Sequence, residues 1–236
     1  MTIIDAKGIA ARNLRIRFRS ILLLFFAGLA VSFLALAVCA AYHVPQFSSL
    51  ASVAAGDLTW ILGYQILAED RDWVSLRARF SVVRSSILWA CAALAVTPTL
   101  VLFATAKVLT WTGVDLPPLP APDFLLGKPG WLPATFLIIV IIAPAAEELM
   151  IRGLLLDWLR QKMAMWPAIL ISALVFGLLH GIALQSGVTG WLQFGIRTAV
   201  GILAAYLAVR YRSLRPSFVL HAANNCFVLV ASGFAT

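Results

Sequence analysis

Ionisable and amide side chains interrupt the apolar second half of this chain, and they are the residues that could do chemistry. They occur in three apolar segments and comprise Glu147, Glu148, Arg152, His180, His221 and Asn225. A glutamate can act as a general base, whereas histidine and asparagine can donate hydrogen bonds to a developing oxyanion. Together these groups meet the two requirements for hydrolysing a peptide bond with an activated water molecule.

The spacing within the first segment separates the two glutamates. Glu148 and Arg152 are four residues apart, so a helix places them on one face in the order that favours an ion pair. Glu147 points about 100° away and is left unpaired, which suits a general base. Pro144 predicts a kink that gives water access beside Glu147. A purely structural alternative stays open, in which both glutamates pair with Arg152 and Arg197, and we expect a structural role for Arg197.

The other two segments each present a pair of candidate residues four positions apart. Phe176 and His180 share one helix face, as do His221 and Asn225. An ionisable group inside the hydrocarbon costs about 2.5 to 3.5 kcal/mol on insertion scales, so each one marks a candidate functional site. The alternative that His180 is a hydrogen-bonded packing residue stays open.

The composition places these segments in a membrane. Of the 236 residues, 62% are hydrophobic and only 12% are charged, whereas an ordinary soluble domain has about a quarter charged residues. Apolar stretches of about 20 residues recur, which predicts an all-α, polytopic transmembrane helical bundle with about seven spans. The net charge of +8 resides in clusters at the segment ends, which is typical of the cytoplasmic side of a membrane protein and not of nucleic-acid binding.

The charged joints predict the organisation of the chain. Residues 1–20 form a basic cytoplasmic N-terminus, 21–113 the N-terminal transmembrane helices, 114–130 a proline-rich loop and 131–236 a catalytic-type transmembrane core. We expect an integral protein of a bacterial inner membrane. The predicted helices cover residues 21–44, 50–68, 85–110, 131–161, 166–184, 190–209 and 216–234. The second contains Gly56 and Asp57, so it is either a full crossing or a re-entrant segment, and Pro98 interrupts the third.

Three short motifs resemble those of a known family. Glu147 to Arg152 resembles the EExxxR motif, Phe176 to His180 the FxxxH motif and His221 to Asn225 the HxxxN motif of the CPBP family. This family groups CAAX prenyl proteases of the Ras-converting type with bacteriocin-processing and immunity (Abi) proteins. The similarity covers about residues 133–230 and leaves the first three predicted helices unassigned.

The resemblance implies roles for the polar residues. Glu147 and His180 would activate the attacking water, and His221 and Asn225 would bind the oxyanion of the tetrahedral intermediate. Glu148 and Arg152 would support the site. The family is often labelled metalloprotease, so Glu147, His180 and His221 are the ligands that a catalytic Zn²⁺ would use, and a metal-free mechanism stays open beside it.

The implied substrate is a membrane-associated peptide or protein, met within the lipid bilayer. Two other functions stay open: a non-catalytic immunity or scaffold protein, and an ion or proton-coupled transporter, in which buried glutamate and histidine are equally natural.

Helix lengths raise one difficulty for the site. Glu147 lies about 24 Å from the outer end of its helix and His180 about 20 Å from the inner end of the next. In a layer of about 30 Å these depths do not coincide. The site therefore requires that the helix of Glu147 be long, tilted or kinked at Pro144, or that the helix of His180 begin deeper in the membrane.

Overall fold

The computed structural model describes residues 18–44, 48–70, 75–114, 132–180 and 187–233, and within them the regular structure is entirely helical. The predicted all-α membrane bundle is confirmed. Five helices in these ranges are long and apolar enough to cross a membrane. They cover Phe18–Ala41, Ser48–Ala68, Ser85–Trp111, Pro133–Arg160 and Gly190–Tyr211, and Met165–Leu179 is a shorter apolar helix.

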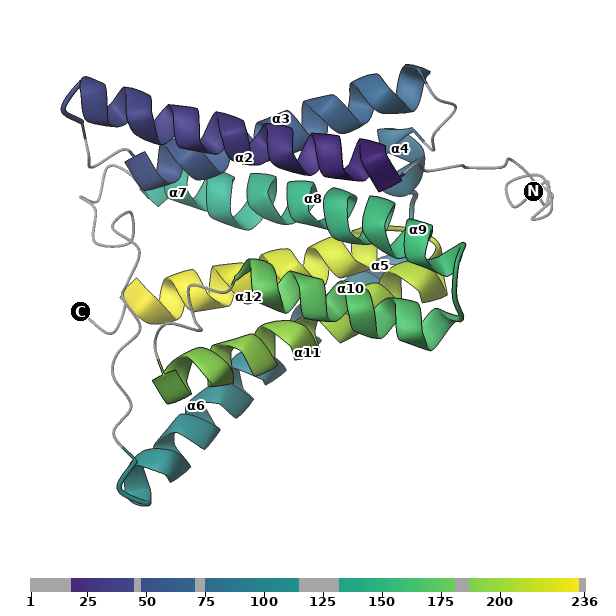
Figure 1. The fold of residues 1–236 in the computed structure, drawn as a ribbon. Coiled ribbons are helices and arrows are strands. Elements are labelled where there is room, and N and C mark those ends of the chain that lie inside the picture. Colours follow the sequence, from purple (N-terminus) through teal and green to yellow (C-terminus); the bar gives the residue numbers. More distant parts are fainter. Residues whose placement is uncertain (1–17, 45–47, 71–74, 115–131, 181–186, 234–236) are drawn as a thin grey trace.

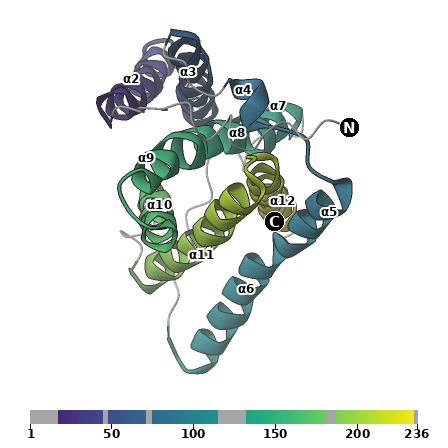
Figure 2. The ribbon, with the colours of Figure 1, turned by 90° about the vertical axis from the view of Figure 1, so that its right-hand side faces the viewer.

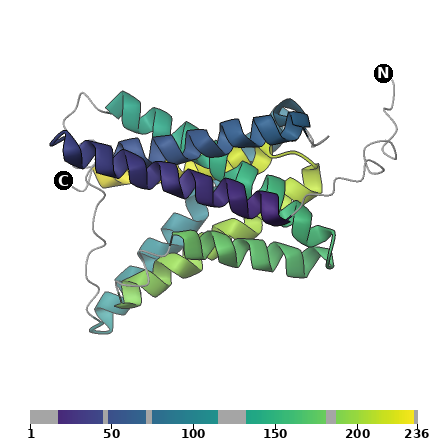
Figure 3. The same ribbon diagram turned by 45° about the horizontal axis from the view of Figure 1, so that its top comes forward.

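Helices α2 (Phe18–Ala41) and α3 (Ser48–Asp70) pack lengthwise against each other. A Cβ on Gly28 of α2 would lie 2.0 Å from Trp60 Nε1 of α3, so the glycine is needed for this close approach. Helix α3 runs without a break through Gly56 and Asp57, which supports the full crossing over the re-entrant segment. The pair lies over the long helix that carries the glutamates (Figure 3).

The next span is broken before its proline. Helix α5 (Ser85–Leu94) ends at Ala95, and α6 (Val96–Trp111) follows and leans away from the bundle (Figure 1). Pro98 has no N–H, so the carbonyl of Leu94 loses the hydrogen bond that would continue the helix, and the break falls there. The predicted loop 114–130 lies outside the described residues except for Val114.

The predicted helix over 131–161 is one continuous rod with two π-helical stretches. It consists of α7 (Leu132–Phe136), η3 (Leu137–Ile142), α8 (Ala143–Glu147), η4 (Glu148–Leu156) and α9 (Asp157–Arg160). The short α8 holds Pro144 and Glu147 between the two π-helical stretches. Such stretches are uncommon and occur frequently at functional sites.

Three more helices complete the bundle: α10 (Met165–Leu179), α11 (Gly187–Tyr211) and α12 (Arg215–Gly233). Of the helix predicted over 166–184, α10 covers the residues up to Leu179 and ends before His180, whereas 181–184 lie outside the described residues. The cause is His180, whose Nδ1 lies 2.8 Å from the carbonyl of Phe176 while its own N–H bonds to Gly177 instead. The imidazole N–H of His180 thus takes the place of its backbone N–H as the donor to the carbonyl of Phe176. Viewed from the end, α8 to α12 surround a common centre, with α2 and α3 outside α8 (Figure 2).

A polar cluster at one end of the bundle joins distant parts of the chain. Arg79 of α4 (Leu76–Arg79) forms an ion pair with Asp157 of α9, and its Nε donates to the hydroxyl of Tyr64 in α3 at 2.9 Å. The backbone N–H of Leu214 bonds to the carbonyl of Arg79 at 2.8 Å, and Arg215 Nε donates to the carbonyl of Phe80 at 2.6 Å. The first helices are thereby fixed to the helices that carry the polar motifs.

Replacing Arg79 tests this connection. Arg79→Ala leaves Asp157 without its ion pair and Tyr64 without its donor, so we expect the free energy of unfolding to fall by about 1–3 kcal/mol. The measurement is thermal or denaturant unfolding of the full-length protein in detergent. Arg77→Ala, on the same short helix but exposed, is the matched control, and an equal loss in both variants would contradict the assignment.

Candidate active site

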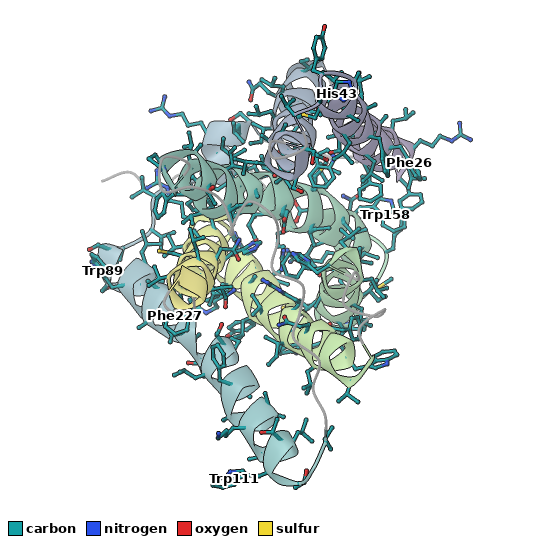
Figure 4. The ribbon with its side chains drawn as sticks, turned by 90° about the vertical axis from the view of Figure 1, so that its left-hand side faces the viewer. Phe26, His43, Trp89, Trp111, Trp158 and Phe227 are labelled. Atoms are coloured by element: carbon teal, nitrogen blue, oxygen red, sulfur yellow. The ribbon has the colours of Figure 1, made fainter. Side chains whose placement is uncertain are left out.

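Three of the predicted site residues, from different parts of the bundle, come together at one carboxylate oxygen of Glu147. Glu147 Oε2 at the end of α8 lies 3.7 Å from His180 Nε2 and 3.7 Å from His221 Nε2. The side chain of Glu147 is 23% exposed and that of His221 only 1%. Figure 4 shows nitrogen and oxygen atoms gathered between α8, α10, α11 and α12. A carboxylate and two imidazoles therefore face one point inside the bundle.

The difference in depth expected between Glu147 and His180 is resolved by one of the stated alternatives, since the helix of Glu147 is long, at 28 residues. The helices that carry them are neighbours joined by the short turn at residues 161–164. Glu147 precedes Arg160, the end of α9, by thirteen residues, and His180 follows Met165, the start of α10, by fifteen. Residues at similar distances from a hairpin turn lie at the same level. The depths of Glu147 and His180 had been counted from opposite membrane faces, which assumes a helix of minimal length, and the helix of Glu147 is longer than that.

His221 is held by a buried ion pair. Glu148 Oε1 lies 3.1 Å from His221 Nδ1 and 3.0 Å from Arg152 Nη1, and these side chains are at most 1% exposed. Because a carboxylate accepts hydrogen bonds, the ring donates its Nδ1–H to Glu148 and turns Nε2 toward Glu147. Glu148 thus sets the orientation of the imidazole.

Arg152 and Phe176 complete the support of this pair. The guanidinium of Arg152 lies 4.3 Å from the ring centroid of Phe176, and its Nη2 is 3.4 Å from the carbonyl of Gly201 in α11. The ring of Phe176 is also 4.6 Å from that of His180 and 5.3 Å, edge on, from that of His221. One aromatic ring therefore contacts the arginine and both histidines, and fixes their spacing.

His180 has a defined tautomer in this network. Its Nδ1 donates to the carbonyl of Phe176 at 2.8 Å, which leaves a lone pair on Nε2 facing Glu147. Glu147 Oε2 and His221 Nε2 are buried and have no hydrogen-bond partner in the described part of the chain. A gap of 3.7 Å is too long for a direct hydrogen bond and suits one that is bridged by a water molecule.

The same donors do not form a ready metal site. Within the described ranges, no group of three or more His, Cys, Asp or Glu side chains is arranged to hold a metal ion. Glu147 Oε2 nevertheless lies 3.7 Å from Nε2 of each histidine, and these are ligand types that Zn²⁺ uses. We derive no step through a metal, and zinc ligation stays a prediction from the family resemblance.

Asn225 makes a contact that the motif spacing did not suggest. Its Nδ2 donates to the carbonyl of Ile139 in η3 at 3.0 Å. In this π-helical stretch the N–H of Ala143 donates to the carbonyl of Ile138, five residues earlier. By the same spacing, the carbonyl of Ile139 would accept a hydrogen bond from the N–H of residue 144. Pro144 has no N–H, and Asn225 supplies the missing donor. One N–H of the amide is used here, so its predicted oxyanion role depends on the other.

Three further polar residues lie near the site or its walls. Asp57 of α3 is buried and interacts electrostatically with Glu147, although the sequence marked it only as an interruption. Asn224 accepts a hydrogen bond from Thr99 of α6 at 3.1 Å, which is a packing contact between helices. Arg197 forms no ion pair with either glutamate in the described residues, so the alternative in which Glu147 and Glu148 pair with Arg152 and Arg197 is met only by Glu148 and Arg152. A buried Asp in an otherwise apolar helix was the signal that could have assigned Asp57 to the site.

The contact of Asn225 with Ile139 can be tested by a double-mutant cycle. Asn225→Ala leaves the Ile139 carbonyl unpaired within the membrane, so we expect the free energy of unfolding to fall by about 1–2 kcal/mol. Pro144→Ala provides a backbone N–H at that position, and in this background the same replacement should cost about 1 kcal/mol less. Denaturant unfolding in detergent measures both. Equal losses in the two backgrounds would show that Pro144 is not the reason for the contact.

The C-terminal part of the chain matches the model of a known protein family. Residues 129–227 match the model described as Rce1-like, Type II CAAX prenyl endopeptidase Rce1-like. The matched segment contains all three motifs and the helices that hold their side chains. Neither the curated proteins nor the solved structures include a match to this chain. The match implies an integral membrane peptidase and confirms the resemblance that the motifs suggested. Residues 129–227 of this chain are therefore similar to the Rce1-like CAAX protease family.

Proposed function

We propose that the protein is an intramembrane endopeptidase in which Glu147 and His180 activate water to hydrolyse a membrane-associated peptide or protein. The observation that supports this most directly is the position of Glu147 Oε2, 3.7 Å from Nε2 of each histidine and inside the bundle. The basic clusters favour a cytoplasmic N-terminus and a bacterial inner membrane as the location. A site at membrane depth favours substrates that are themselves in or on the bilayer.

Water activation follows from the hydrogen-bond roles of the two acceptors. The ionised carboxylate of Glu147 and the Nε2 lone pair of His180 both lack protons, and Phe176 keeps the histidine in this form. A water molecule between them donates one hydrogen to each, which leaves an oxygen lone pair directed away from both acceptors. Glu147 then removes a proton as the oxygen attacks the substrate carbonyl.

His221 is suited to bind the resulting oxyanion. A proton on Nε2 would give His221 a second hydrogen-bond donor beside Nδ1–H. In that form Nδ1–H bonds to Glu148 and Nε2–H is free to donate to the oxyanion. The second N–H of Asn225 would add another donor on the same face of α12.

The reaction closes without a covalent enzyme intermediate. The oxygen of water forms a bond to the carbonyl carbon, and the bond from that carbon to the amide nitrogen then breaks. Glu147 passes the proton it gained to the leaving amine and returns to its ionised form. The second proton of the water stays on the new carboxyl group and then passes to the amine, so the products are a carboxylate and a protonated amine, and the enzyme is unchanged.

Replacing the three central residues tests the mechanism. We expect Glu147→Gln, His180→Ala and His221→Ala each to lower kcat by about 10²- to 10⁴-fold on a membrane peptide that the wild-type protein cleaves, because each removes a proton acceptor or donor from the reaction. The assay uses the full-length protein in lipid vesicles. The third histidine of the chain, His43, is exposed at the end of α2, so His43→Ala is the matched control. Wild-type turnover by Glu147→Gln would overturn the proposal.

Metal removal is an independent test of the proposed mechanism. Because the proposed mechanism uses no metal ion, we expect cleavage to survive prolonged treatment with 1,10-phenanthroline. Activity that is lost on chelation and restored by Zn²⁺ would contradict the metal-free mechanism while leaving the peptidase assignment in place.

A further inference from the structure

Arg197 is an arginine at membrane depth that the three motifs do not use. It lies in the middle of α11, one helical turn before Gly201, so both residues share one face of that helix. The carbonyl of Gly201 receives the hydrogen bond from Arg152. The face that carries Arg197 is therefore the one that borders the buried ion pair.

The packing of α10 against α11 sets the level of Arg197. A Cβ on Gly201 would lie 3.0 Å from Ala173 Cα, and a Cβ on Gly177 would lie 2.4 Å from Thr198 Oγ1. The two helices are antiparallel, so Arg197 lies level with Gly177. Side chains on a helix point toward its N-terminus, which directs the long side chain of Arg197 toward the level of His180.

Over the ranges that the structure describes, Arg197 lacks the neutralising carboxylate partner that two other arginines of the helical bundle have. Arg152 and Arg79 each form an ion pair with a carboxylate. Among the described residues, Arg197 has neither an ion pair nor a hydrogen bond, yet it interacts electrostatically with Glu147 and His180. An arginine in a span is costly and usually faces a functional site. Its five N–H donors are therefore held near the reacting centre without being used.

We propose that Arg197 is a catalytic residue that stabilises the oxyanion formed when water attacks the substrate. This inference rests on the proposed function. Before attack, the negative charge near Arg197 is on Glu147. During attack Glu147 gains a proton and becomes neutral, while the carbonyl oxygen of the substrate becomes negative. The negative charge thus moves from Glu147 to the carbonyl oxygen of the substrate, and both lie within the electrostatic field of the Arg197 guanidinium.

The position of Asn225 supports a need for such a residue. Part of its amide is occupied by the carbonyl of Ile139, so the donors on α12 are His221 and one remaining N–H. Arg197 approaches from α11 instead. A direct ion pair with Glu147 would reduce the strength of the base, and the structure shows none. Separation of the two charges keeps Glu147 available as a base and Arg197 available for the oxyanion.

The test compares turnover with the binding of two ligands. In Arg197→Gln we expect kcat for the membrane peptide cleaved by the wild-type protein to fall about 10²- to 10³-fold with KM within about threefold. Arg197→Lys should retain part of the activity. A phosphinic peptide of the same sequence, whose anionic tetrahedral group resembles the intermediate, should lose affinity by the same factor as kcat/KM. Arg210→Gln, an exposed position at the end of α11, is the control and should leave all three values unchanged.

The possible outcomes separate the two proposals. Unchanged kcat in Arg197→Gln, or a rise in KM alone, overturns the oxyanion role and leaves the peptidase intact. Equal losses of affinity for the phosphinic peptide and for the uncleaved substrate bound to Glu147→Gln also overturn it, since they indicate a general binding role. If the wild-type protein cleaves no membrane peptide, the proposed function fails and the role of Arg197 fails with it.

Discussion

The buried ion pair between Glu148 and Arg152 is the interaction on which the rest of the site depends. Two charges removed from water at membrane depth are costly, and each further polar or aromatic contact lowers that cost. Here the carboxylate also binds His221 and the guanidinium contacts Phe176 and Gly201. These partners come from α10, α11 and α12. The ion pair therefore holds three helices around the helix that carries Glu147, and the geometry of the candidate site follows from that packing.

Pro144 imposes a second constraint on the same helix. By removing one backbone donor beside a π-helical stretch, it leaves the carbonyl of Ile139 in need of a partner, and Asn225 supplies it. The proline thereby links the helix of the glutamates to α12. The same short segment, α8, presents Glu147 to the two histidines. The local defect in the helix and Glu147 therefore lie within one five-residue segment.

The charges around Glu147 are arranged so that it stays unpaired. Glu148 takes Arg152 as its direct partner, while Arg197 acts on Glu147 from a distance. Asp57, from the α2 and α3 pair outside the matched segment, adds a second carboxylate to this field. The helices that no motif assigned therefore contribute to the electrostatics of the site and also cover one side of it.

Much of the fold and part of the site could be predicted from the sequence alone. Apolar runs longer than a bilayer determine that the chain is a helical membrane bundle, and a spacing of four residues determines that Glu148 meets Arg152, because both are local properties of a helix. Contacts between helices are not local. The tertiary structure decided that Glu147 meets both histidines, that α10 stops at Leu179, that Asn225 serves a carbonyl left free by Pro144, and that Asp57 and Arg197 lie in the field of Glu147. These depend on helix register, on π-helical turns and on which carbonyl lacks a donor, and residue types and spacings in one helix do not contain that information.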